Sequence, residues 1–285
     1  MNRASPGIER FFSWSSIDSN SRVVILASIL LICSIPHSTG QETITGWNEA
    51  ESWTDHDLNA AIIHGELVWV FGDSGVVRFS EDSGATWQNH TNLGDVDLIS
   101  ADSYENTMVV LSTDGIIYMK DELESEWITI DSSQTGMKSI ALAGEESLII
   151  VGNEGAIWHY TDQTWWNRTT SFTENLHDVD FNGDEDGLAV GNGGTILATD
   201  NGGTTWDYRE APDPESSIVS VSYFNPYRMF AVSDSGQIIY STTPGGFEWQ
   251  LREIESAGYN TTTVSYTHLR AHETVLDLVC RLLLE

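Results

Sequence analysis

Four polar side chains near the middle of the chain have the spacing of a calcium-binding loop. They are Asp178, Asp180, Asn182 and Asp184. Calcium takes about six to eight oxygen ligands, and such a loop supplies a bidentate Glu at its twelfth position, which is Ala189 here. Because this ligand is missing, the sequence favours a strand whose acidic side chains point to solvent, followed by an acidic hairpin. Calcium is the weaker alternative.

A second metal-like group occurs near the C-terminal end. His268 and His272 would lie one turn apart on a helix, with Glu273 beside them, as paired metal ligands do. However, residues 264–285 resemble one reading frame of a sequencing adapter, whose two ends match 264–274 and 277–284. We interpret residues 264–285 as adapter-derived, with an amphipathic helix as the alternative, and we expect no metal site there.

The calcium-like loop belongs to a unit of about 40 residues that is repeated along the chain. Turn glycines and tryptophans both recur every 39 to 43 residues. They are Gly75, Gly115, Gly155, Gly194 and Gly236, and Trp47, Trp87, Trp127, Trp166, Trp206 and Trp249. A period near 40 with four short strands per unit is typical of a β-propeller. We therefore predict an all-β fold with five full four-stranded blades.

Hydrophobic patterning places the strands of each blade. Alternating or apolar runs predict first strands at 60–63, 96–99, 137–142, 176–181 and 218–224. Continuously apolar runs predict second strands, buried on both faces, at 67–71, 108–111, 148–151, 188–190 and 229–232. Gly, Asn and Asp between the second and third strands tolerate the positive φ of tight turns.

The turn after the third strand carries the most specific motif, S/T-x-D/N-x-G-x-T-W. Its two full copies are Ser80, Asp82, Gly84, Thr86 and Trp87, and Thr199, Asn201, Gly203, Thr205 and Trp206. An Asp or Asn side chain accepts backbone N–H bonds across a turn, Gly adopts positive φ, and Trp packs on the blade. We therefore predict a structural brace. The copies at 120–127, 161–166 and 242–249 keep mainly the Trp.

This motif resembles the Asp-box of BNR-type propellers. The wider pattern over residues 56–253, L-x-x-V-x-F, G-x-A-V-G-x-x-G-x-I and T-x-D-G-G-x-T-W, resembles the photosystem II assembly and stability factor family. The resemblance implies an exported, seven-bladed propeller that binds an assembly intermediate in photosynthesis and is no enzyme. Members present basic residues on one face. By contrast, residues 41–263 hold seven basic residues that do not cluster in sequence.

Sialidases also carry Asp-boxes, so a secreted glycoside hydrolase or a glycan-binding propeller is the alternative function. Sialidase chemistry needs several arginines that converge on a carboxylate. The five arginines of residues 41–263 are scattered over second, third and outer strands, and they are Arg78, Arg168, Arg209, Arg228 and Arg252. We therefore assign no catalytic residues, and we expect no cofactor. Crowded aromatic residues at 158–166 could instead bind a ligand, although core packing explains alternate members.

The charge of the chain limits the classes of partner that it can bind. Residues 41–263 contain 38 of the 43 acidic residues and no cysteine, and the net charge of the chain is −31. Such a surface repels nucleic acid and anionic lipid. The partner is then a protein or an extracellular ligand that the sequence does not identify.

Residues 1–40 have the pattern of a secretory signal peptide. An apolar run at 23–35 follows Arg3, Arg10 and Arg22, and it precedes the small residues Ser38 and Gly40. The run is too short to span a bilayer of about 30 Å. We expect a secreted or extracytoplasmic protein, with an uncleaved N-terminal anchor as the alternative. Residues 41–263 form the propeller, and an extra strand at 44–54 suggests a C-terminally truncated ring of six or seven blades.

Overall fold

Five four-stranded antiparallel sheets make up the described part of the chain. The computed structural model describes residues 56–64, 67–82, 84–120 and 126–252. In chain order, the strands of the five blades are β1 (Leu58–His64), β2 (Leu67–Gly72), β3 (Val77–Ser80) and β4 (Gln88–Asn89); β5 (Leu98–Tyr104), β6 (Thr107–Ser112), β7 (Ile116–Lys120) and β8 (Ile128–Asp131); β9 (Met137–Leu142), β10 (Leu148–Gly152), β11 (Ile157–Thr161) and β12 (Thr164–Asn167); β13 (Leu176–Asn182), β14 (Asp186–Gly191), β15 (Ile196–Asp200) and β16 (Asp207–Arg209); β17 (Ile218–Asn225), β18 (Arg228–Ser233), β19 (Ile238–Ser241) and β20 (Gln250–Arg252).

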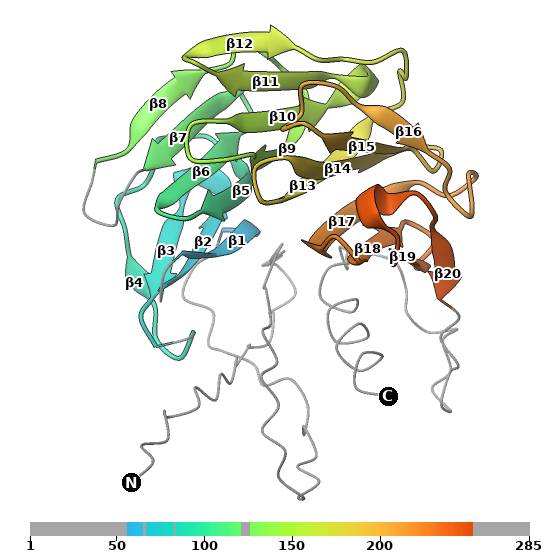
Figure 1. The fold of residues 1–285 in the computed structure, drawn as a ribbon. Coiled ribbons are helices and arrows are strands. Elements are labelled where there is room, and N and C mark those ends of the chain that lie inside the picture. The colour runs from blue at the N-terminus through green and yellow to red at the C-terminus, as the bar shows by residue number, and fades with distance from the viewer. Residues whose placement is uncertain (1–55, 65–66, 83, 121–125, 253–285) are drawn as a thin grey trace, which may run out of the picture.

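The sheets are arranged as blades around a common centre. In each blade the strands follow one another as a meander, from an inner strand to an outer strand. Figure 1 shows β1, β5, β9, β13 and β17 side by side around the centre, with β4, β8, β12, β16 and β20 at the rim. The predicted all-β propeller with five full four-stranded blades is confirmed. The predicted segments 1–40, 44–54 and 264–285, and any further blades, lie outside the described residues.

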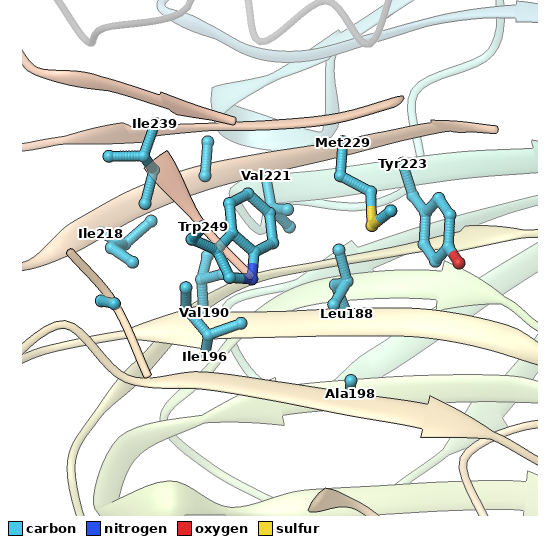
Figure 2. Packing of buried hydrophobic residues seen from close by; sticks show 12 residues of the cluster. Leu188, Val190, Ile196, Ala198, Ile218, Val221, Tyr223, Met229, Ile239 and Trp249 are labelled. Atoms are coloured by element: carbon cyan, nitrogen blue, oxygen red, sulfur yellow. The ribbon is translucent and has the colours of Figure 1, made fainter. Parts of the chain in front are cut away.

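The hydrophobic core lies between neighbouring blades. The second strands β2, β6 and β10 are buried along their whole length, which is the reason for their continuous apolar sequence. Figure 2 shows the contact between blades 4 and 5, where Leu188 and Val190 of β14 face Val221, Met229 and Trp249 of blade 5. Similar clusters join blades 1 and 2, blades 2 and 3, and blades 3 and 4.

Each inner strand begins with an irregularity that the sequence pattern does not reveal. The register of β1, β5, β9, β13 and β17 shifts by one residue near the start of the strand. Such a bulge turns the following side chains relative to the partner strand. In β13 the shift lies between Leu176 and Asp178. It therefore helps to orient the polar residues that line the centre.

One predicted strand boundary was wrong. The first strand of blade 2 was expected at 96–99, but β5 runs from Leu98 to Tyr104. In its second half Ser100, Asp102 and Ser103 are polar, and polar strand residues resemble a loop when they are read from sequence alone. In the fold these side chains bond to the neighbouring blades, so the strand continues.

Candidate functional site

The Asp-box of blade 1 forms a closed set of hydrogen bonds within its own turn. Ser80 Oγ donates to Asp82 Oδ1 at 2.8 Å and accepts the Gly84 N–H at 2.8 Å. Thr86 donates its N–H to Asp82 Oδ1 at 2.7 Å and its hydroxyl to Oδ2 at 2.6 Å. The hydrogen bonds from Thr86, and then that from Ser80, lower the pKa of Asp82 to about 2. Both carboxylate oxygens of Asp82 are therefore occupied in holding the turn.

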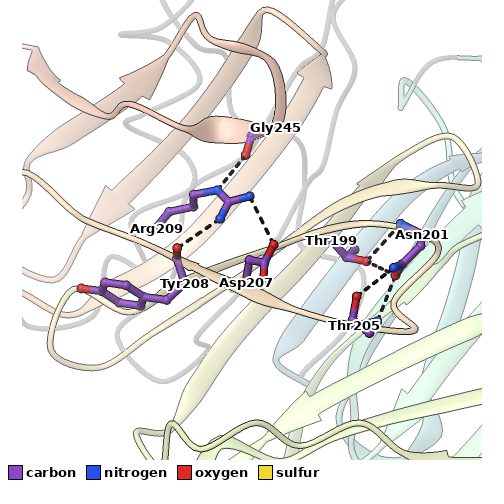
Figure 3. A network of polar contacts seen from close by, with 7 residues as sticks. All are labelled: Thr199, Asn201, Thr205, Asp207, Tyr208, Arg209 and Gly245. Atoms are coloured by element: carbon purple, nitrogen blue, oxygen red, sulfur yellow. Dashed lines mark hydrogen bonds and ion pairs between the residues drawn. The ribbon is translucent and has the colours of Figure 1, made fainter.

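The Asp-box of blade 4 makes the same turn with an amide in place of the carboxylate. Asn201 Oδ1 accepts the Thr205 N–H at 2.9 Å, and its Nδ2 donates to Thr205 Oγ1 at 2.8 Å, as Figure 3 shows. Thr199 Oγ1 accepts the Gly203 N–H at 3.0 Å. Trp206 Nε1 donates to Gly203 O at 3.1 Å. The geometry makes this motif a turn brace that holds its own Trp.

Three tryptophans of the repeat, Trp127, Trp206 and Trp249, pack toward the preceding blade. Trp206 belongs to the cluster between blades 3 and 4, and Trp249 to the cluster between blades 4 and 5. Trp127 packs against the cluster of blades 1 and 2. Trp87 packs against a cluster whose described members all belong to blade 1. The motif thus connects a local turn to the contact between two blades.

Blade 5 keeps part of the brace that its sequence had seemed to lose. Thr243 Oγ1 accepts the Glu248 N–H at 3.0 Å, and Ser241 Oγ lies 3.0 Å from Thr243 Oγ1. A threonine hydroxyl therefore does in this turn what Asp82 does in blade 1. The longer spacing between Thr243 and Trp249 hides this relation in the sequence.

The calcium-like residues are divided between two environments. Asp178 accepts hydrogen bonds from blades 3 and 5, and Asp180 accepts one from blade 5, whereas Asp184 lies in the exposed turn between β13 and β14. The expectation that the strand acids point to solvent was wrong for Asp178 and Asp180. Both side chains bond to backbone N–H groups of β17, the inner strand of the next blade, instead of pointing to solvent. Within the described ranges, no group of three or more His, Cys, Asp or Glu residues is arranged to hold a metal ion.

A chain of hydroxyl and carboxylate groups crosses the inner strands of blades 2 to 5. Ser100 Oγ lies 3.4 Å from Ser139 Oγ, and Ser139 Oγ donates to Asp178 Oδ1 at 2.8 Å. Ser220 Oγ donates to Asp178 Oδ2 at 2.8 Å. These four residues occupy equivalent positions in four successive blades. The chain therefore connects the inner strands around the centre.

Two further aspartates fasten one inner strand to the next. Asp102 Oδ2 of β5 accepts the Leu142 N–H of β9 at 2.8 Å. Asp180 Oδ2 of β13 accepts the Tyr223 N–H of β17 at 2.7 Å. Burial raises the pKa of Asp180 to about 8, and repulsion from Asp102 adds to this shift. Burial also raises the pKa of Asp102 to about 6. Sequence reasoning missed this arrangement, although aligning the inner strands at the period of the repeat would have revealed the shared positions.

The arginines do not converge on one point. Arg78 lies in β3, Arg209 and Arg252 end the outer strands β16 and β20, Arg228 begins β18, and Arg168 follows β12. None of these five lies on an inner strand. Arg209 connects two blades, because its Nε donates to Gly245 O of blade 5 at 3.4 Å (Figure 3). Its guanidinium also lies 4.4 Å from the Phe247 ring centroid. Among the described residues, the arginines form no cluster of the kind that a sialidase needs.

The aromatic residues of blade 3 are mostly structural. Trp158, Tyr160 and Trp165 pack against the cluster between blades 2 and 3. Trp165 Nε1 also donates to Asp131 O of blade 2 at 3.2 Å. Trp166 is exposed, with Arg168 5.6 Å from its ring centroid. A single exposed ring with its own cation is a poor stacking platform for a glycan.

Comparison with known proteins supports the resemblance seen in the sequence. The model of the photosynthesis system II assembly factor YCF48 family matches residues 159–258, which include the outer half of blade 3 and all of blades 4 and 5. No curated protein matches the chain. In the part of the chain that the structure describes, no helix is long and apolar enough to cross a membrane.

Three solved structures are similar to this chain at low sequence identity. YCF48 bound to D1 peptide is 18% identical, with 65% of this chain and 77% of that chain covered and a TM-score of 0.38. YCF48 from Cyanidioschyzon merolae is 13% identical, with 71% and 87% covered and a TM-score of 0.47. The WD40 repeats of RRP9 are 12% identical, with 68% and 64% covered and a TM-score of 0.57. The WD40 likeness supports the propeller fold alone. Over residues 159–258, this chain is therefore similar to the YCF48 assembly factor family, and its described residues form a β-propeller.

Proposed function

We propose that this propeller is an exported, non-enzymatic scaffold that binds a protein partner. The observation that carries the proposal is the match of residues 159–258 to a family described as an assembly factor. The geometry is consistent with it, because the Asp-box residues and the inner aspartates all hold turns or blades together.

The charge of the chain favours a partner with a basic binding segment. The net charge is −31, and opposite charges steer association and help to fix register. One of the similar structures is YCF48 bound to D1 peptide, in which the bound partner is a peptide. We infer that the partner of this chain is likewise a polypeptide, for which a photosystem assembly intermediate is the first candidate.

Two measurements on the native protein test the scaffold. Chemical cross-linking in intact cells, followed by purification, should recover one partner in near-stoichiometric amount, and salt should release it when cross-linking is omitted. A monodisperse protein without any partner would contradict the proposal. In parallel, fluorogenic sialosides and glycosides should show no turnover above that of heat-denatured protein. Turnover that purifies with the folded protein would show an enzyme instead.

Export is tested separately. The apolar run at 23–35 between arginines and small residues is the support for a signal peptide. The mature protein should therefore begin near residue 41 when its N-terminus is sequenced, and it should be recovered outside the cytoplasm. A mature protein that retains residues 1–40 in the membrane fraction would show an anchor.

A further inference from the structure

The inner strands have an edge toward the centre that no strand of their own sheet covers. β5, β9, β13 and β17 each stand at the end of the strand order in their blade. Backbone groups on such an edge need partners from outside the sheet. Asp102 supplies one for the Leu142 N–H, and Asp180 supplies one for the Tyr223 N–H. These two hydrogen bonds join blade 2 to blade 3 and blade 4 to blade 5.

The two aspartates share one electrostatic environment although they lie in blades 2 and 4. The equivalent residue of blade 3, Ala141, carries no charge. Asp178 is the third acid that acts on both. Asp102 and Asp180 are half-buried. Like charges in a half-buried site repel each other more than they do on an exposed surface, because water screens them less.

No basic group on the neighbouring inner strands balances these acids. The basic side chains of the described inner strands are His64, Lys138 and His177. His64 is buried, and burial lowers its pKa. Lys138 is exposed, and the His177 ring contacts Asn192. The ion pair that the described residues show, Arg209 with Asp207, lies on the outer strand of blade 4.

We propose that Asp102 and Asp180 form a proton-dependent lock between the inner strands. When both carboxyl groups are neutral, each still accepts its backbone N–H, and the two groups do not repel each other. When both are ionised, the two carboxylates repel each other, and no cation of the described inner strands offsets this repulsion. The contacts between blades 2 and 3 and between blades 4 and 5 therefore open more often. The lock depends on the fold alone and holds whichever partner the propeller binds.

The direction of the pH effect follows from the raised pKa values. The pKa of Asp180 is about 8 and that of Asp102 about 6 in the folded state, against 3.8 ordinarily. A raised carboxyl pKa stabilises the closed state fully below pH 3.8, and this stabilisation is lost as pH rises toward the folded value. Between these limits, each group can increase the opening constant up to about tenfold per pH unit.

Hydrogen exchange at the two bonded amides tests the lock. We expect the protection factors, corrected for intrinsic exchange, to fall between pH 5.5 and 8 by more than about tenfold at the Tyr223 amide. At the Leu142 amide the fall should be only about fourfold, because the titration of Asp102 is largely complete above pH 6. Asp180→Asn should flatten this dependence at Tyr223, and Asp102→Asn should flatten it at Leu142. Asp184→Asn is the matched control, because it removes one negative charge from the exposed turn next to β13. It should behave as the unchanged protein does.

The outcomes separate the lock from a general effect of charge. Protection that stays constant with pH in the unchanged protein would overturn the proposal. So would an equal flattening in Asp184→Asn, since any lost charge would then suffice. Should a variant fail to fold, ¹³C carboxyl titration of the unchanged protein decides. Midpoints near 4 for both aspartates would refute the lock, and midpoints raised by two or more pH units at either would support it.

Discussion

At the scale of single residues, the turn before the outer strand has the same geometry in three blades, although different chemical groups close it. Asp82, Asn201 and Thr243 each accept a backbone N–H that closes the turn before the outer strand. A carboxylate, an amide and a hydroxyl all offer an acceptor oxygen, and only the carboxylate titrates. The three turns should therefore differ in their response to acid while sharing a shape.

Asp82 should contribute stability that acid removes. Its pKa is lowered to about 2 from 3.8, so its stabilising effect is complete above pH 3.8 and is lost as pH falls toward 2. In Asp82→Asn the amide can still accept the Thr86 N–H, as Asn201 does for Thr205. We expect the urea midpoint of the unchanged protein to fall more between pH 4 and 2 than that of Asp82→Asn. Asp95→Asn, at an exposed position, should follow the unchanged protein, and a parallel fall in all three would contradict the assignment.

Gly203 is required for close packing as well as for its backbone angle. Its φ is +80°, and a Cβ there would lie 2.5 Å from Cδ1 of Ile149 in blade 3. Gly183 has nearly the same φ, +82°, with nothing within 4 Å of a Cβ. Gly183→Ala should therefore cost only the backbone strain, about 1 kcal/mol, and Gly203→Ala should cost about 1–3 kcal/mol more.

A double variant checks the cause of that difference. Ile149→Val removes Cδ1, so it should recover part of the loss when it is combined with Gly203→Ala, as measured by urea unfolding. Additive losses in the double variant would show that the contact with Ile149 is not the cause.

At the scale of the strand, the sequence predicts the blades better than it predicts their centre. The second strands and the Asp-box turns are recognisable because apolar runs and turn residues report local requirements. The inner strands are different, since their polar residues Ser100, Asp102, Asp178 and Asp180 read as solvent-facing. An alternating pattern separates the two faces of a strand, but it does not say what covers each face. Bonds to a residue some 40 positions away have no local signal.

The strands of one blade should differ sharply in their tolerance of substitution. In blade 2, Leu111 of β6 is fully buried, whereas Ile128 of the outer strand β8 is 52% exposed. Leu111→Ala should lower the free energy of unfolding by about 2–5 kcal/mol, because it removes buried surface and leaves a cavity. Ile128→Ala should change it by about 0.5 kcal/mol or less. Equal effects, measured by urea unfolding, would contradict the placement of these strands.

At the scale of the whole molecule, the propeller is held against a large excess of negative charge. The chain carries 43 acidic and 12 basic residues, and self-repulsion of this kind destabilises a folded state. In the described residues, apolar contacts between blades offset this repulsion more than ion pairs do. Arg209 and Asp207 form an ion pair at 3.9 Å in the described residues, on an exposed outer strand where such a pair contributes little.

Salt should therefore stabilise the protein by screening the repulsion between its carboxylates. Comparing different cations at the same ionic strength tests whether screening explains the whole effect. The Debye length falls from about 10 Å at 0.1 M to about 3 Å at 1 M salt, so repulsion between surface carboxylates weakens over that range. We expect the thermal midpoint to rise with NaCl, and to rise equally with MgCl2 and CaCl2 when ionic strength is matched. A larger rise with millimolar CaCl2 alone would instead indicate a specific calcium site. If such a calcium effect is found, Asp184→Asn locates the ion. Loss of the effect in this variant would place the ion at the turn after β13, and an unchanged effect would place it elsewhere.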